Sequence, residues 1–158
     1  MYKNKQLPLR IGVGIILLNH ENKVFVGKRI DNPKNFWQMP QGGVNQNENF
    51  LHAAKRELEE ETGIKSVELV KELNEWLKYD LPENLLGKVL EGKYRGQKQK
   101  WFIMKFLGKE NEINVKTKNP EFLTWKWVEI SKLPSIAVNF KVDLYKKLKE
   151  ELNFLNSS

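Results

Sequence analysis

The sequence predicts an α+β fold, an α/β/α sandwich in which a mixed β-sheet lies between helices. Segments with strand character occur before and after one central amphipathic segment, and a second amphipathic segment closes the chain. Helices and strands in this order bury their apolar faces by packing in layers. A length of 158 residues is enough for one hydrophobic core, so we expect residues 1–158 to form a single domain.

The N-terminal strands are predicted from the alternation of side chains. Residues 11–18 are apolar or glycine throughout, with Ile, Val, Ile and Leu at the odd-numbered positions. A turn-like Asn-His-Glu-Asn sequence separates them from residues 23–28, so the two segments predict a hairpin. Residues 31–43 hold two prolines and two glycines around an aromatic centre, which predicts a short strand at residues 36–39 between two loops.

The central helix is predicted from apolar residues spaced three and then four positions apart between Leu51 and Leu58. The pattern stops at Gly63, where a helix that ends in a left-handed residue favours glycine. Asn47 and Asn49 are the two candidate N-caps.

The rest of the chain predicts four strands, a long loop and a final helix. The final helix follows from apolar residues that repeat every four positions from Phe140 to Leu152, with Leu155 widening the apolar face. The strands are expected at residues 67–70, 76–81, 99–107 and 122–128, and the loop at residues 82–96.

Composition narrows the class of protein. The chain has no Cys, which excludes disulfide scaffolds, cysteine zinc sites and thiol nucleophiles. A net charge of +7 is compatible with a polyanionic partner such as nucleic acid or a nucleotide, and equally with lysines on a solvated surface. The longest early apolar run, residues 11–18, is far shorter than the roughly 20 residues of a membrane helix. We therefore expect no membrane partner and a cytoplasmic location.

Four glutamates lie near the predicted C-terminal end of the central helix, where the helix dipole disfavours negative charge. A spacing of 100° per residue places Glu57, Glu60 and Glu61 on one side of the helix and Glu59 elsewhere. Three converging carboxylates suit hard divalent cations, Mg²⁺ or Mn²⁺, with more than one ion expected during turnover. The alternative is a solvated acidic helix face.

Residues 42–64 read G-x5-E-x7-R-E-L-x-E-E-x-G-I, which resembles the Nudix box. The resemblance implies the Nudix fold and Mg²⁺- or Mn²⁺-dependent hydrolysis of a diphosphate linked to another moiety. It makes Glu57, Glu60 and Glu61 the metal ligands of the catalytic site. It further implies that Arg56 orients these glutamates through an ion pair, and that glycines allow tight turns; the structural box residues are Gly42, Gly43, Glu48 and Gly63.

Five further blocks resemble the bacterial RNA 5′-pyrophosphohydrolase family, which merges with the dinucleoside polyphosphate hydrolases. The resemblance makes Glu121 a metal ligand from outside the box and, with Glu61, a candidate general base. The blocks are Trp37–Gly43, Trp76–Tyr79, Gly96–Phe102, Pro120–Phe122 and Trp125–Val128. The residues that it places around the substrate are Arg10, Arg29, Gln41, Tyr79, Val138, Phe140 and Lys141.

The expected activity is removal of pyrophosphate from 5′-triphosphorylated RNA, which leaves a 5′-monophosphate and promotes mRNA decay. One alternative is hydrolysis of dinucleoside polyphosphates such as Ap4A or Ap5A, and a minor one is an inactive RNA-binding module. Residues 88–105 form a basic strip in which Trp101 and Phe102 either stack on RNA bases or belong to the core. A protein activator is unknown.

Overall fold

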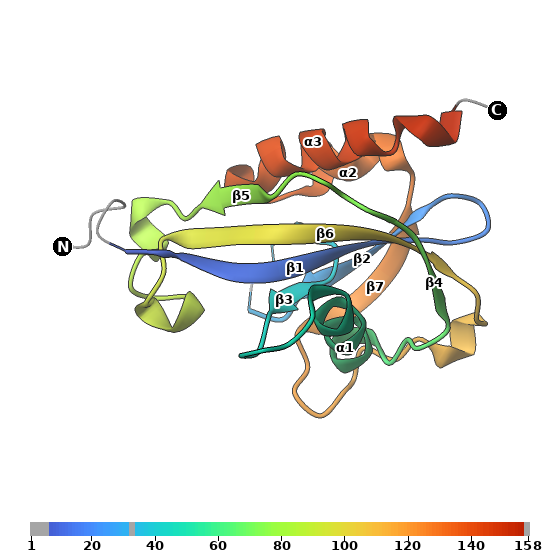
Figure 1. Cartoon of the computed structure of the whole chain (residues 1–158), viewed down its shortest axis with the longest axis horizontal. Coiled ribbons are helices and arrows are strands. Elements are labelled where there is room, and N and C mark those ends of the chain that lie inside the picture. The colour runs from blue at the N-terminus through green and yellow to red at the C-terminus, as the bar shows by residue number, and fades with distance from the viewer. Residues whose placement is uncertain (1–6, 32–33, 157–158) are drawn as a thin grey trace.

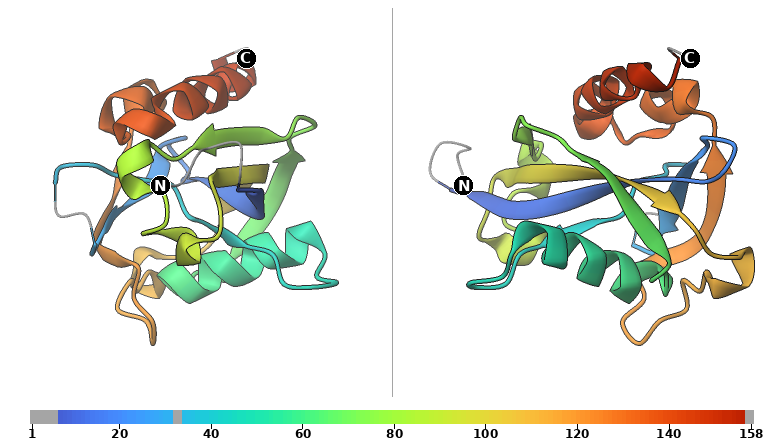
Figure 2. Two further views of the ribbon diagram at one scale, coloured as in Figure 1. Left: turned by 90° about the vertical axis from the view of Figure 1, so that its left-hand side faces the viewer. Right: turned by 45° about the vertical axis from the view of Figure 1, so that its right-hand side comes forward.

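A computed structural model describes residues 7–31 and 34–156. It contains a mixed sheet whose main strand order is β4-β6-β1-β2-β7, with β3 paired to β1 and β5 paired to β6. Helices α2 and α3 lie on one face of the sheet and α1 lies on the other (Figures 1 and 2). The strands are β1 (Leu9–Leu18), β2 (Val24–Arg29), β3 (Gln41–Gly43), β4 (Val67–Glu72), β5 (Leu77–Asp80), β6 (Gly96–Phe106) and β7 (Phe122–Val128), and the helices are α1 (Phe50–Thr62), α2 (Leu133–Ile136) and α3 (Val142–Glu151).

Strand β1 is the centre of the sheet and is buried on both faces. It runs parallel to β6 over ten residue pairs, from Leu9↔Gly96 to Leu18↔Lys105. Val13 and Ile15 belong to the core under α1, whereas Ile16 belongs to the core under α3. Burial on both sides explains why this strand is apolar throughout its second half.

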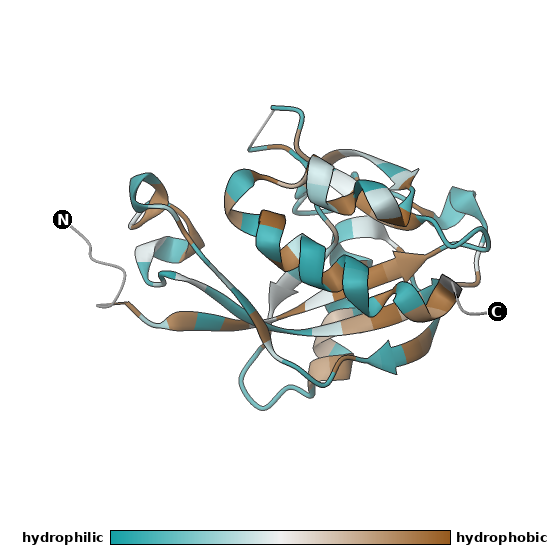
Figure 3. Ribbon diagram, turned by 90° about the horizontal axis from the view of Figure 1, so that it is seen from above, coloured by the Kyte–Doolittle hydropathy of each residue, from teal (hydrophilic) through white to brown (hydrophobic). Residues whose placement is uncertain are grey.

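Hydrophobic residues run along the strands, and hydrophilic residues cover much of the outer side of α3 and the loops (Figure 3). Among the residues that the structure describes, no helix is both long and apolar enough to span a membrane.

The ends of α1 are formed by residues that the sequence singles out. The Asn49 side chain accepts a hydrogen bond from the His52 backbone N–H at 3.0 Å and is the N-cap. Gly63 has φ 75° and its N–H donates to the Glu59 carbonyl, which is a left-handed C-cap. Asn47 has φ 64° and supports the turn before the helix instead of capping it. Of the two candidate N-caps, Asn49 is correct.

Two predicted elements were wrong in position or extent. The short strand lies at Gln41–Gly43 and not at residues 36–39, where only Gln38 bridges to Gly27. A strand of one glutamine and two glycines has no apolar alternation, so its pairing with β1 leaves no hydropathy signal. The final helix is interrupted: α3 ends at Glu151, and separate 3₁₀ turns precede and follow it. The four-residue helix α2 is too short to produce a periodic pattern.

Tyr145 of α3 connects this helix to the segment before β3. Its hydroxyl accepts a hydrogen bond from the Met39 backbone N–H at 2.8 Å, and its side chain is fully buried. Burial raises the pKa of the Tyr145 hydroxyl, which therefore stays protonated. The bond joins residues that are 106 positions apart in the chain.

We expect Tyr145→Phe to lower the free energy of unfolding by about 1–3 kcal/mol, because the buried Met39 N–H loses its acceptor. Urea unfolding followed by circular dichroism measures this change. Tyr94→Phe is the matched control, since the half-buried Tyr94 hydroxyl has no hydrogen bond within the described residues. Equal stabilities of the two variants would contradict the assigned role of the Tyr145 hydroxyl.

Candidate active site

Arg56 is the centre of the hydrogen bonds that join α1 to the loop before it. Its Nε and Nη2 donate to the two carboxylate oxygens of Glu48 at 2.7 and 2.9 Å, and Nη2 also donates to the Gly43 carbonyl at 2.9 Å. Its Nη1 donates to Glu57 at 2.8 Å and to Glu60 at 3.1 Å. The guanidinium lowers the pKa of the Glu48 carboxyl to about 2. The pair therefore stays ionised and fixes the loop on the helix.

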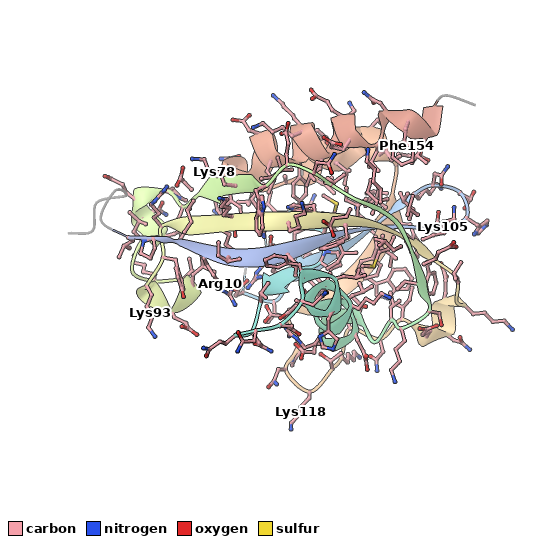
Figure 4. All side chains as sticks on the ribbon, in the orientation of Figure 1. Arg10, Lys78, Lys93, Lys105, Lys118 and Phe154 are labelled. Atoms are coloured by element: carbon pink, nitrogen blue, oxygen red, sulfur yellow. The ribbon has the colours of Figure 1, made fainter. Side chains whose placement is uncertain are left out.

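Two glycines let this loop approach charged side chains closely. A Cβ on Gly42 would overlap the Glu57 carboxyl group, and a Cβ on Gly43 would overlap the Arg10 guanidinium. Figure 4 shows Arg10 on the side of β1 that faces β3 and α1. Glycine at both positions thus brings Glu57 and Arg10 against the backbone of the box.

Glu61 is a buried carboxyl group, only 3% exposed, and its Oε1 atom has no hydrogen-bond partner within the described residues. Burial raises its pKa well above the usual range, and the negative charges of Glu57 and Glu121 raise it further. Burial also raises the pKa of Glu57. The carboxylates of Glu57 on α1 and of Glu121, directly before β7, thus both act on Glu61, and a cation would stabilise this arrangement.

Glu60 is much more exposed than the predicted ligands Glu57 and Glu61. Its carboxylate is exposed and turned to Arg56, which lies one helical turn away. Within the described chain, no three acidic or histidine side chains are gathered closely enough to hold a metal ion. The described side chains are thus not arranged around a common point, and the convergence of Glu57, Glu60 and Glu61 on a cation stays a prediction. The physical reason is that one nitrogen of Arg56 holds both Glu57 and Glu60, whereas Glu61 is buried and has no bond to this guanidinium among the described residues.

A cleft of about 1030 Å³ lies between β5 with the following loop and the segment after α2, and Gln41 of β3 and Arg29 of β2 belong to its lining. Six of the seven predicted substrate-binding residues line it; Arg10 does not and lies on the Nudix-like box instead. The six are Arg29, Gln41, Tyr79, Val138, Phe140 and Lys141. The Tyr79 and Phe140 rings contact each other with centroids 5.7 Å apart.

Arg29 joins the cleft to the carboxylates. Its Nε and Nη2 donate to Asp31 at 2.7 Å each, and Nη2 also lies 3.4 Å from Glu121. Lys28 and Arg29 are neighbours in β2, where successive side chains point to opposite faces of the sheet, and the β2–β7 register shifts between them. The Arg29 guanidinium therefore lies between the cleft and the Glu121 carboxylate.

A profile of the NUDIX domain matches residues 8–148. The chain belongs to the Nudix family. The RNA pyrophosphohydrolase of Pelagibacter ubique (strain HTCC1062) is 61% identical over 153 residues, with coverage of 96% of this chain and 97% of the relative. The RNA pyrophosphohydrolase of Bartonella clarridgeiae is 48% identical over 168 residues, with coverage of 97% and 94%.

Solved structures confirm the Nudix fold. The E. coli dihydroneopterin triphosphate pyrophosphohydrolase superposes with a TM-score of 0.71 at 18% identity, covering 92% of this chain and 99% of the other. A C. elegans Ap4A hydrolase superposes with a TM-score of 0.63 at 20% identity, covering 89% and 97%. At these identities the similarity shows the fold alone. The predicted mixed sheet between helices is therefore confirmed.

Sequence reasoning missed a row of buried amides in this Nudix site. The Trp101 indole donates to Gln99 Oε1 at 3.1 Å, and Gln99 Nε2 donates to Gln41 Oε1 at 3.0 Å. Gln97 Nε2 donates to the Tyr79 hydroxyl at 2.7 Å. Because an indole N–H only donates, the row has a fixed direction, and the Gln41 amide is turned toward the Tyr79 hydroxyl, with which it also forms a hydrogen bond. The signal was the alternation of polar side chains in an otherwise buried strand, β6.

The basic strip of residues 88–105 divides between the surface and the core. Trp101 and Phe102 are fully buried, so stacking of RNA bases on these two rings is excluded and their alternative role in the core is confirmed. They belong to different clusters, Trp101 under α3 and Phe102 under α1. Alternation along β6 sends neighbouring side chains to opposite faces of the sheet.

Lys141 lies at the base of the cleft and is only 5% exposed. Its Nζ donates to Gln38 Oε1 at 3.2 Å and lies 5.0 Å from the centre of the Tyr79 ring. Burial lowers the pKa of Lys141 to about 7, and the charge of Arg29 lowers it further, while Glu61 and Asp31 oppose the shift. An anionic ligand would favour the charged form of this lysine.

We expect Lys141→Met to stabilise the free protein at pH 7 more than at pH 9. The pKa is about 7 in the fold and about 10.4 in the unfolded chain, so unfolding takes up a proton between these values. The free energy of unfolding of the wild type then rises by up to about 1.4 kcal/mol per pH unit. The Lys141→Met variant lacks this dependence, because methionine does not titrate. Thermal unfolding at several pH values, without metal, measures the difference between the two proteins. A difference that stays constant with pH would contradict the lowered pKa.

Proposed function

We propose that this Nudix enzyme is an RNA pyrophosphohydrolase that removes pyrophosphate from 5′-triphosphorylated RNA and leaves a 5′-monophosphate, which promotes mRNA decay. The observation that carries the proposal is the cleft that brings cations and aromatic rings together, because its Arg29 lies 3.4 Å from Glu121 and within the electrostatic influence of Glu61. Relatives named RNA pyrophosphohydrolase, at 61% and 48% identity over nearly the whole chain, support it.

The donor set suits Mg²⁺ or Mn²⁺, because it consists of carboxylates and includes the unpartnered oxygen of buried Glu61. Glu57, Glu60, Glu61 and Glu121 are the residues that would hold such ions, with more than one ion expected during turnover. When bound, the metal lowers the pKa of water and neutralises charge on the phosphate oxygens. Glu60 would have to leave Arg56 to join the other ligands.

The residues of the chain supply orientation and proton transfer. Arg56 holds Glu57 against the loop, and Arg10 lies beside Glu57 where a phosphate would approach. Glu61 and Glu121 are the two carboxylates placed to accept the proton of the attacking water. Water adds to the phosphorus nearest the ribose, the bond to the bridging oxygen breaks, and pyrophosphate leaves.

The cleft provides contacts for the 5′ end of the RNA substrate. Arg29 and Lys141 would pair with phosphate oxygens, and the Gln41 amide would donate a hydrogen bond. Phe140 and Tyr79 offer ring faces, and Val138 an apolar contact, for an unstacked base. Tyr79 is buried and lies behind Phe140, so Phe140 is the ring closer to the base.

In the presence of Mg²⁺, we expect the kcat/KM for pyrophosphate release from 5′-triphosphorylated RNA to exceed the kcat/KM for hydrolysis of Ap4A. The reason is that the cleft has contacts for a nucleotide chain. Turnover of γ-labelled RNA and of Ap4A under the same conditions measures this. EDTA should abolish both reactions and added Mg²⁺ should restore them. Survival of the triphosphate RNA would overturn the proposal, and a preference for Ap4A would favour the dinucleotide alternative.

We expect Glu60→Gln to lower kcat by about 100-fold or more, since it removes a negative charge that would hold the metal ion, and the metal ion stabilises the charge that develops on the phosphate oxygens. The fold should be unchanged, because this side chain is exposed and glutamine still accepts from Arg56. Glu59→Gln is the control, as Glu59 is exposed on the same helix and faces Lys65 at 3.6 Å. Turnover equal to wild type in Glu60→Gln would remove Glu60 from the ligand set.

A further inference from the structure

We propose that Trp37, Lys28 and Lys126 form a rim subsite that holds the phosphodiester backbone of RNA downstream of its 5′ end. The inference rests on the proposed function and adds to it a contact beyond the first nucleotides. It would also explain how the enzyme distinguishes RNA from a dinucleoside polyphosphate.

Trp37 lines the cleft and is held there by its backbone. Its N–H donates to the Ile136 carbonyl at 2.9 Å. The next residue, Gln38, exchanges two backbone hydrogen bonds with Gly27 of β2 at 2.8 and 2.9 Å. The backbone at Trp37 is therefore held between β2 and the end of α2. Its side chain lines the cleft next to Gln38.

Two lysines reach this ring from neighbouring strands. Lys126 Nζ lies 4.2 Å and Lys28 Nζ 5.9 Å from the centre of the Trp37 ring. In the β2–β7 pairing, Val26 lies opposite Lys126 and Lys28 opposite Thr124. Lys28 and Lys126 are thus diagonal neighbours on one face of the sheet, and both project beside Trp37.

The charge of these lysines is not neutralised by the protein. Within the described residues, neither Lys28 nor Lys126 has a carboxylate at ion-pair distance, whereas Lys23 lies 3.7 Å from Glu129 on the same two-strand unit. Two cations beside one ring repel each other, and attraction to the ring face offsets this only in part. An anion bound between them would relieve the repulsion.

The position of the rim subsite favours an RNA backbone as this anion. Arg29 faces Glu121 and the reacting phosphates, whereas the preceding residue, Lys28, faces Trp37. A nucleotide chain with its 5′ phosphates at Arg29 can continue along the cleft to Trp37, which offers a stacking face of little sequence preference. A dinucleoside polyphosphate has all its phosphates between its two nucleosides. Once these lie at the carboxylates, it has no further phosphate for the rim subsite.

The test compares 5′-triphosphorylated RNAs of two and eight nucleotides, and Ap4A, on the wild type and on Lys28→Ala/Lys126→Ala. We expect kcat/KM on the longer RNA to fall about tenfold, through KM, with little change on the other two substrates. The slope of log kcat/KM against log salt should decrease in magnitude by about 1.4 on the longer RNA, as expected for two lost contacts to a single strand.

Lys71→Ala/Lys147→Ala is the matched control. It removes the same two charges from exposed positions, and Lys71 also lies beside an aromatic ring, 5.7 Å from the centre of Phe154. Neither residue lies over the Trp37 ring, where Lys28 and Lys126 lie. The control variant should keep the wild-type dependence on RNA length.

Binding of a fluorescent, 5′-monophosphorylated eight-nucleotide RNA, measured by anisotropy, separates the two proposals. Weaker binding by Lys28→Ala/Lys126→Ala than by the wild type supports the rim subsite even if the wild type fails to hydrolyse triphosphate RNA. Unchanged binding and length dependence in an active enzyme would overturn the subsite and leave the proposed function standing. An equal loss on all three substrates would also overturn it, because the lysines would then support the site as a whole.

Discussion

The ion pair between Arg56 and Glu48 is the interaction on which the site depends. It connects the middle of α1 to the loop that enters the helix, and the same guanidinium extends to Gly43, Glu57 and Glu60. Both side chains are largely buried, so water competes little for these bonds. Removal of either partner would leave an uncompensated charge at the base of the loop. Glu57 and Glu60 are therefore placed by a cation that need not take part in the proposed chemistry.

Buried ionisable groups also lie on the two sides of Arg29. Glu61 and Lys141 are buried groups of opposite charge, and burial shifts the pKa of each toward its neutral form. Arg29, bonded to Asp31 and close to Glu121, separates them. Within the described residues, the Glu61 carboxyl group has an oxygen without a hydrogen-bond partner, and Lys141 has no carboxylate at ion-pair distance. A metal ion on one side and phosphates on the other would satisfy both, which explains why the two halves adjoin.

Much of the local structure was predictable because it follows from short-range rules. The N-cap at Asn49, the left-handed Gly63 and the hairpin of β1 and β2 each depend on residues within a few positions of one another. The position of β3 was not predictable, since its glycines pair with β1 through backbone atoms alone. Glu60 shows the same limit within the box. Helical spacing places it beside the other glutamates, but it does not show that the Glu60 carboxylate turns to Arg56 at the surface while Glu61 is buried.

The sequence by itself determined the family, the order of the main elements and the residues of the box, because these are encoded in fixed spacings along one stretch of chain. Only the tertiary structure decided which distant residues share the cleft. Arg29, Tyr79 and Lys141 come from three separate parts of the chain, and sheet pairing and the packing of the C-terminal segment bring them together. It also decided that Trp101 lies in the core while Trp37 faces the cleft between two lysines. Composition shows that a chain has cations and rings, but burial determines which of them a ligand can reach.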